Sequence, residues 1–311
     1  MIINTGARTD IPAFFSTWFL NRIKEGFVNV RNPYNKEQVT RYKLTPDVVD
    51  CLIFCTKNPH PILPRLHELD AFASYWFVTI TPYGRDIEPN VPSVVQVIRD
   101  VQTLSQALGS HRVCLRYDPI FIDQRYTVER HIEEFGKMAK DLSGYVDECV
   151  ISFIDLYEKT KRNFPGIREV RPEEQIQLAK GFSQIGKRYS ISVKTCAEAV
   201  DLQQYGVQRS GCITQAVMEK AIGMTLKNIR RKPNRYHCGC IPNRDIGAYN
   251  TCSHGCKYCY ANYNQETVKR NVQIHDPNSP LLIGRLGKDD IVHDAAQESY
   301  IDGQLSLLSI D

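Results

Sequence analysis

The chain has 311 residues, of which 42% are hydrophobic and 24% charged, and its formal net charge is +4. This composition can bury a large core in one large or two small globular units, and the mild charge neither requires nor excludes a polyanionic substrate. The eleven cysteines, with no apolar leader and no run long enough to cross a bilayer, argue against secretion, a disulfide framework and a membrane partner, and predict a cytoplasmic location.

Hydrophobic periodicity divides the first 200 residues into alternating strands and helices. The predicted strands cover residues 2–5, 51–56, 75–80, 112–117, 148–154 and 191–195. The predicted helices cover residues 10–26, with Asp10 as N-cap and Pro12 in the first turn, 63–69, 93–108, 128–142 and 173–185. This alternation predicts an α/β fold with a parallel sheet and right-handed crossovers, in the form of a (β/α) barrel or partial barrel.

Polar residues follow six of the apolar strand runs. Because a (β/α) barrel has its active site at the carboxyl ends of its strands, we expect these residues to surround a ligand, although each alone would also suit an ordinary cap or turn. The cationic candidates, for a carboxylate or phosphate, are Arg8, Lys57, Arg116 and Lys194. Asp118 and Asp155 are the candidates for binding hydroxyl or amino groups.

A loop near the C-terminal end carries Cys252, Cys256 and Cys259 in CxxxCxxC spacing. Four-iron clusters bound by cysteine usually take four thiolates, so three on one short loop imply an iron with an open position for a small molecule. The alternative is a structural zinc loop, which normally needs four Cys or His ligands in paired spacing. His254 or a distant thiol would complete that zinc site.

With Tyr258 just before its last cysteine, this loop resembles that of the radical S-adenosylmethionine superfamily. The resemblance implies a [4Fe-4S] cluster on the three cysteines, with S-adenosylmethionine bound to the free iron and Tyr258 near the adenine. It also implies an enzyme that makes a 5′-deoxyadenosyl radical, supplied with electrons by a donor such as flavodoxin or ferredoxin. The polar strand ends would then bind the carboxylate, the amino group and the ribose hydroxyls.

The position of the loop departs from the usual order of that superfamily, in which it follows the first barrel strand. Here it follows six βα units, and residues 246–250 are expected to form the strand that carries it. A circularly permuted barrel accounts for this order. We therefore expect a barrel core over residues 1–200, a cysteine-rich iron–sulfur segment over 201–264 that completes the barrel, and a C-terminal extension over 265–311.

Over its whole length the chain resembles an uncharacterised bacterial family of such permuted radical S-adenosylmethionine-like proteins. The segments that carry this resemblance are residues 8–12, 56–59, 116–119 and 245–252. Residues 256–262 are also similar to the loop of spore photoproduct lyase, which points to a DNA lesion as substrate and to a role in DNA repair.

A second group of four cysteines has the composition of a metal site: Cys196, Cys212, Cys238 and Cys240. The last two of them are in CxC spacing. Four thiolates can ligate a second [4Fe-4S] cluster or a zinc ion. The alternative is that they are small buried fillers. The remaining four are predicted to be core residues, since they lie in strand-like runs: Cys51, Cys55, Cys114 and Cys149.

The end of the chain, from Gln304 to Leu308, is similar to the short peptide with which bacterial DNA polymerases and repair proteins dock on the sliding clamp. An ordinary apolar tail is the alternative. Two function classes therefore stand: a radical S-adenosylmethionine enzyme, with nucleic acid as the leading substrate, and a non-catalytic interaction module that binds zinc or an iron–sulfur cluster.

Overall fold

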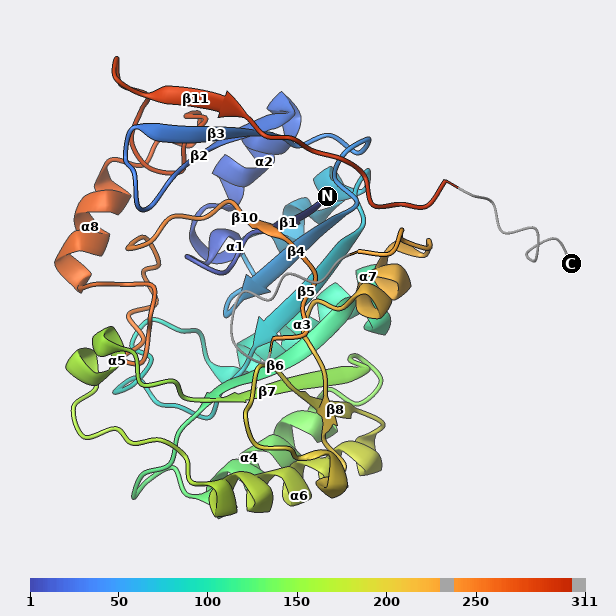
Figure 1. Ribbon diagram of the computed structural model, residues 1–311. Coiled ribbons are helices and arrows are strands. Elements are labelled where there is room, and N and C mark those ends of the chain that lie inside the picture. Colours follow the sequence, from blue (N-terminus) through green and yellow to red (C-terminus); the bar gives the residue numbers. More distant parts are fainter. Residues whose placement is uncertain (230–237, 304–311) are drawn as a thin grey trace, which may run out of the picture.

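A sheet of eight parallel strands runs through the centre of the molecule (Figure 1), in a computed structural model that describes residues 1–229 and 238–303. Its strand order is β10-β1-β4-β5-β6-β7-β8-β9. The strands are β1 (Ile2–Asn4), β4 (Cys51–Thr56), β5 (Ser74–Thr79), β6 (Val113–Ile120), β7 (Glu148–Phe153), β8 (Ser192–Thr195), β9 (Gln208–Arg209) and β10 (Arg244–Asp245). The predicted α/β fold with a parallel sheet is confirmed.

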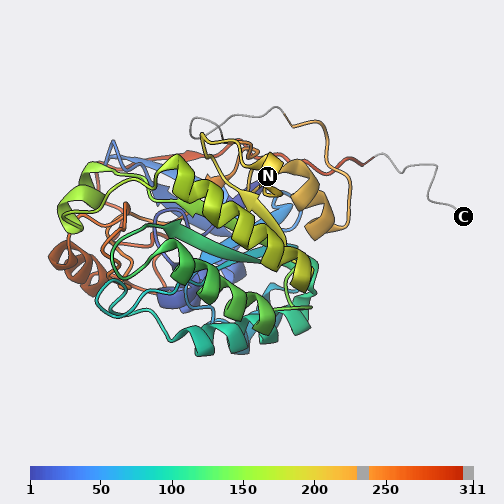
Figure 2. The ribbon, with the colours of Figure 1, turned by 90° about the horizontal axis from the view of Figure 1, so that it is seen from below.

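Three long helices cover one face of this sheet and lie side by side in Figure 2. They are α3 (Val94–Leu108), α4 (Val128–Asp141) and α6 (Pro172–Tyr189), and each connects two neighbouring strands. Their apolar residues belong to one large core cluster with alternate strand residues such as Leu52 and Phe54, which are completely buried. The other face of the sheet forms a smaller cluster that includes Ile53 and Cys196.

The first predicted helix is in fact two helices, α1 (Ile11–Phe14) and α2 (Ser16–Glu25), because Phe15 between them has a non-helical backbone. Asp10 accepts a hydrogen bond from the Ala13 amide at 3.1 Å, as expected of the N-cap. The shorter helices are η1 (Leu63–Leu69), η2 (Ser110–Arg112), α5 (Glu158–Asn163), η3 (Gln203–Tyr205), α7 (Gln215–Ile222) and α8 (Gln265–Gln273).

A second sheet of three strands, absent from the sequence prediction, lies beside α2 at the top of Figure 1. It consists of β2 (Phe27–Arg31), β3 (Gln38–Lys43) and β11 (Ile291–Asp294). Strand β11 brings the C-terminal extension onto β3, and the Trp18 indole donates to the Ser279 carbonyl at 2.9 Å. The described part of the extension is therefore folded against the rest of the chain.

The large sheet ends at β9 on one side and at β10 on the other, and no ladder joins these two strands among the described residues. The backbone nevertheless comes together there, because the Ile241 amide donates to the Ile213 carbonyl at 2.8 Å. The prediction of a strand over residues 246–250 is wrong: the strand is Arg244–Asp245, and it pairs with β1. The last strand of the sheet in sequence thus lies beside the first.

Two of the sequence predictions concern the surroundings of the chain. Within residues 1–229 and 238–303, every helix is too short or too polar to cross the hydrocarbon core of a membrane. The proposed clamp peptide, Gln304 to Leu308, lies outside the described residues and stays a prediction.

His131 in α4 is buried and is expected to stay neutral through most of the acid range. Its ring nitrogens lie 2.8 Å from the Tyr117 hydroxyl and 2.9 Å from the Phe121 carbonyl, and burial lowers its pKa to about 4. Between about pH 6.5 and 4 the unfolded chain takes up a proton there and the folded chain does not, so the free energy of unfolding falls as the pH falls, by on the order of 3 kcal/mol. NMR titration of the imidazole gives the check: a midpoint near 6.5 would contradict this environment.

Candidate metal and cofactor site

The CxxxCxxC loop follows β10 and lies at the carboxyl ends of β1 and β4, the side toward which the arrowheads of β4 and β5 point in Figure 1. All three of its cysteines are half-buried free thiols. Two hydrogen bonds hold the loop in shape: the Cys259 amide donates to the Cys256 carbonyl at 3.1 Å, and the Asn262 side chain donates to the Cys252 carbonyl at 2.7 Å.

His254, inside the loop, is an anchor and is not available as a metal ligand. Its Nε2 lies 2.8 Å from the Asp10 carboxylate, its Nδ1 lies 3.4 Å from the Asn90 carbonyl, and its side chain is 3% exposed. Asp10 also accepts from the Lys57 amide at 2.8 Å. The zinc alternative in which His254 completes the ligand set therefore does not fit.

Glu88, which sequence reasoning missed, is the centre of a buried polar network beside the loop. Its Oε1 accepts hydrogen bonds from the Lys57 ammonium at 3.0 Å, from the Thr81 hydroxyl at 2.7 Å and from the Tyr258 hydroxyl. Its side chain is only 3% exposed. This network fixes the positions of two predicted cofactor-binding residues, Lys57 and Tyr258, around a single carboxylate.

The loop thiols lie in an environment that disfavours thiolates unless a cation is present. Burial raises the pKa of Cys252 well above its ordinary value, and it also raises the pKa of Cys259. Burial likewise raises the pKa of Cys256 to about 12, although Lys57 opposes that shift. Because metal ligation requires deprotonated thiols, binding of a metal here would release protons.

Lys57 keeps its charge in this setting. Burial alone would lower its pKa, but Glu88 and then Cys256 outweigh that effect, so the pKa is raised. The ammonium therefore stays beside the thiols as a fixed positive charge.

The donor set and its surroundings fit a cofactor larger than one ion. In the described structure, the sulfurs of Cys252, Cys256 and Cys259 do not all lie within 4.8 Å of one another. The ligands of a single metal ion lie closer together than this. A multi-iron cluster places each thiolate on a different iron and so tolerates wider spacing. Three buried side-chain oxygens near the loop have no hydrogen-bond partner in the described structure. They are Oγ1 of Thr9, which follows β1, Oδ1 of Asn58, which follows β4, and Oδ1 of Asn262, which follows the loop.

Arg116 and Asp118, both predicted to bind a cofactor, pair with each other at 2.6 Å on β6. Burial opposes the charge on Arg116, but Asp118 and then the Cys212 and Cys196 thiols raise its pKa well above its usual range. The guanidinium thus lies within electrostatic reach of the second cysteine group.

Two other candidates lie at the rim of the site. Arg8 faces Asp245 at 3.6 Å and stacks over the Tyr249 ring, 5.6 Å from its centroid, just before the cysteine loop. Asp155 is exposed and accepts from the Tyr157 hydroxyl at 3.3 Å.

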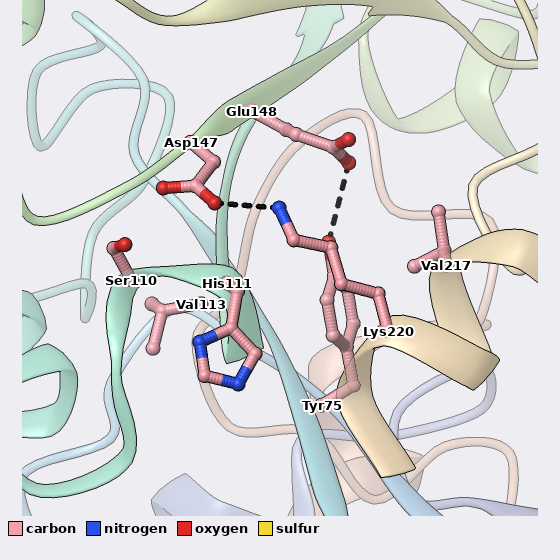
Figure 3. Close-up of a pocket in the computed structure, with 8 residues that line it drawn as sticks. All are labelled: Tyr75, Ser110, His111, Val113, Asp147, Glu148, Val217 and Lys220. Atoms are coloured by element: carbon pink, nitrogen blue, oxygen red, sulfur yellow. Dashed lines mark hydrogen bonds and ion pairs between the residues drawn. The ribbon is translucent and has the colours of Figure 1, made fainter. Parts of the chain in front are cut away.

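Lys194 is not brought to this site. Its ammonium pairs with Glu148 at the amino-terminal end of β7, beside the small cavity shown in Figure 3. There Lys220 contacts Asp147 at 2.7 Å, and the Tyr75 hydroxyl lies 3.5 Å from Glu148. The cavity has a volume of about 10 Å³, enough for about one water molecule.

The second cysteine group does converge. The Cys212 sulfur lies 3.5 Å from that of Cys196 and 3.4 Å from that of Cys240, and the sulfurs of these three all lie within 4.8 Å of one another. The side chain of Cys238 interacts with that of Cys240. Three nearby cysteines that could hold a metal ion are therefore shown, with the fourth adjacent.

Of the cysteines predicted to be core, Cys51, Cys114 and Cys149 are buried. Cys55 is only half-buried, and the charges close to it include Arg116 and Cys212. It therefore faces the space around the second cysteine group.

Comparison with known proteins returns a single result. None of the curated proteins and none of the solved structures matches the chain. A family model described as a domain of unknown function, DUF1848, matches residues 2–261. This match covers most of the chain, from β1 through the whole CxxxCxxC loop, and the protein therefore belongs to the DUF1848 family.

Proposed function

We propose that this protein is a radical S-adenosylmethionine enzyme built on a circularly permuted (β/α) barrel. The observation that carries the proposal is the loop of Cys252, Cys256 and Cys259, which presents three half-buried thiols at the carboxyl ends of the strands. When bound there, a [4Fe-4S] cluster would supply the electron that cleaves S-adenosylmethionine to a 5′-deoxyadenosyl radical. An electron donor of the flavodoxin or ferredoxin type would reduce the cluster.

The residues around the loop would bind and orient the cofactor. Lys57, held by Glu88 at 3.0 Å, supplies a positive charge for a carboxylate, and Arg8 supplies a second one at the rim. Tyr258 is 9% exposed, so its ring walls the site while Glu88 fixes its hydroxyl. The unpaired oxygens of Asn58 and Asn262 are acceptors that amino or hydroxyl groups of a ligand would satisfy.

The rim beside the loop favours nucleic acid as the substrate. Three tyrosines there are large exposed aromatics: Tyr157, Tyr260 and Tyr263. Helix α5 adds Lys159, whose ammonium donates to the Tyr260 carbonyl at 3.3 Å, and Arg162, which stacks 4.1 Å from the centroid of Tyr263. Exposed aromatics interleaved with cations are the surface on which single-stranded bases stack.

The rival function, an interaction module with zinc in both cysteine groups, is less well supported. The three loop sulfurs are not all within 4.8 Å of one another in the described structure, and both nitrogens of His254 are engaged by Asp10 and Asn90.

The test is slow turnover without substrate. Protein reconstituted anaerobically with iron and sulfide, then reduced with dithionite, is expected to be brown and to release 5′-deoxyadenosine from S-adenosylmethionine, and single-stranded DNA that carries photolesions should raise that rate. A fully loaded, reduced protein that releases none, and whose spectrum does not change on adding S-adenosylmethionine, would refute the proposal. A rate that DNA does not alter would refute the substrate class alone.

A further inference from the structure

Outside the CxxxCxxC loop, the thiols of Cys196, Cys212 and Cys240 meet where the large sheet is open, and Cys238 lies beside Cys240. Cys196 directly follows β8, Cys212 lies just after β9, and Cys238 and Cys240 lie just before β10. They thus come from both sides of the gap between the two edge strands of the sheet. Cys196 and Cys240 are also buried, at 3% and 5% exposure, so the group is part of the protein interior and is not a chance grouping of exposed side chains.

The distances between the sulfurs decide which metal fits. Tetrahedral zinc with Zn–S bonds of about 2.3 Å holds its sulfurs about 3.8 Å apart. The two sulfur–sulfur distances of 3.4 and 3.5 Å are close to this value, whereas a four-iron cluster would spread the thiolates over different irons. We infer that Cys196, Cys212, Cys238 and Cys240 bind a single zinc ion in a closed, structural four-thiolate site.

Two glycines allow the ligands to meet. A Cβ at Gly211 would lie 2.5 Å from the Gly239 carbonyl carbon, and a Cβ at Gly239 would lie 2.9 Å from the Gly211 nitrogen. Only glycine lets these two backbones approach so closely, and each glycine is a neighbour of ligand residues, Cys212 on one side and the Cys238–Cys240 pair on the other. The close approach therefore places the thiols opposite one another.

The surroundings also suit a zinc tetrathiolate, which carries a net charge of −2. The Ile213 amide donates to the Cys240 sulfur at 3.3 Å, the kind of outer contact that orients a metal ligand. The Arg116 guanidinium lies in electrostatic reach of Cys212 and Cys196 and would offset part of the negative charge.

The position of the site indicates its role. In the described residues, the seam between β9 and β10 is crossed by the hydrogen bond from the Ile241 amide to the Ile213 carbonyl, by that from the Ile213 amide to the Cys240 sulfur, and by the contact of the two glycines. Zinc coordination would join the segments after β8, after β9 and before β10 across this seam. It would thereby close the sheet into a barrel and fix β10, from which the CxxxCxxC loop extends.

The inference is tested on full-length protein grown with zinc and purified without iron–sulfur reconstitution. Mass spectrometry of the metals is expected to find one zinc per chain, and X-ray absorption at the zinc edge should find four sulfur ligands at about 2.3 Å. Cys212→Ser should lose the zinc, and Cys114→Ser, in a buried cysteine of β6, should keep it. The X-ray absorption spectrum is measured on the wild-type protein, so the inference can still be tested if the Cys212→Ser variant fails to fold.

The outcome is independent of the proposed enzymatic activity. A variant with Cys252, Cys256 and Cys259 all replaced by alanine should keep its zinc whether or not the wild-type protein cleaves S-adenosylmethionine. Wild-type protein without zinc, zinc with nitrogen or oxygen ligands, or an iron cluster that remains in the triple variant would each overturn the inference.

Discussion

Replacing Cys252, Cys256 and Cys259 together with alanine is expected to lower the iron content of reconstituted protein by about four atoms per chain and to bring release of 5′-deoxyadenosine to background. The reason is that the loop presents these three half-buried thiols together at the carboxyl ends of β1 and β4, and His254 cannot replace one of them while it is bound to Asp10. Iron analysis and product assay on the same preparation measure both effects.

The matched control is Cys114→Ala, which removes a buried thiol from β6 without touching the loop. It should retain the full iron content. If the triple variant kept its iron while the control also did, the assignment of the cluster to this loop would be wrong.

Glu88→Ala should destabilise the protein more than any surface substitution. It removes the carboxylate that accepts from Lys57, Thr81 and Tyr258 and leaves the Lys57 ammonium buried without its partner. Breaking a buried ion pair in this way costs about 3–5 kcal/mol of the free energy of unfolding. Urea unfolding of the metal-free protein gives the value.

Two further variants make this result specific. Glu133→Ala removes an exposed glutamate that pairs with Lys137 on α4, and its unfolding midpoint should stay at the wild-type value. Lys57→Met combined with Glu88→Leu should recover much of the lost stability, because no buried charge is then left unpaired. Equal midpoints for Glu88→Ala and Glu133→Ala would show that the network around Glu88 contributes little.

The sheet could be predicted because its central strands are long apolar runs separated by amphipathic helices. Strands β9 and β10 could not be, since two residues carry no period, and their place is set by pairing with β8 and β1. The short antiparallel pair of β2 and β3 was missed because the alternation in residues 27–43 is interrupted by charged residues and is completed only by β11.

The site was predictable where spacing is local and unpredictable where partners are distant. The CxxxCxxC spacing identifies its own loop, but nothing in the sequence around Glu88 indicates that it meets Tyr258, 170 positions away. Lys194 follows an apolar run just as Lys57 does, yet its long side chain reaches back to Glu148. A residue's place at a strand end fixes its backbone and leaves the direction of a flexible side chain open.

The pairing of β10 with β1 fixes an order of events during synthesis. Ile3 leaves the ribosome about 240 residues before its partner Arg244, a delay of roughly 12–50 s at ordinary rates of translation. Strands β4 to β8 can pair within that time, while the edge of β1 that will pair with β10 stays unpaired. The loop that we propose to bind the iron–sulfur cluster therefore emerges after the strands that surround it have had time to pair. A chain whose synthesis stops before Cys252 contains no such loop, and so it cannot expose a cluster to oxygen.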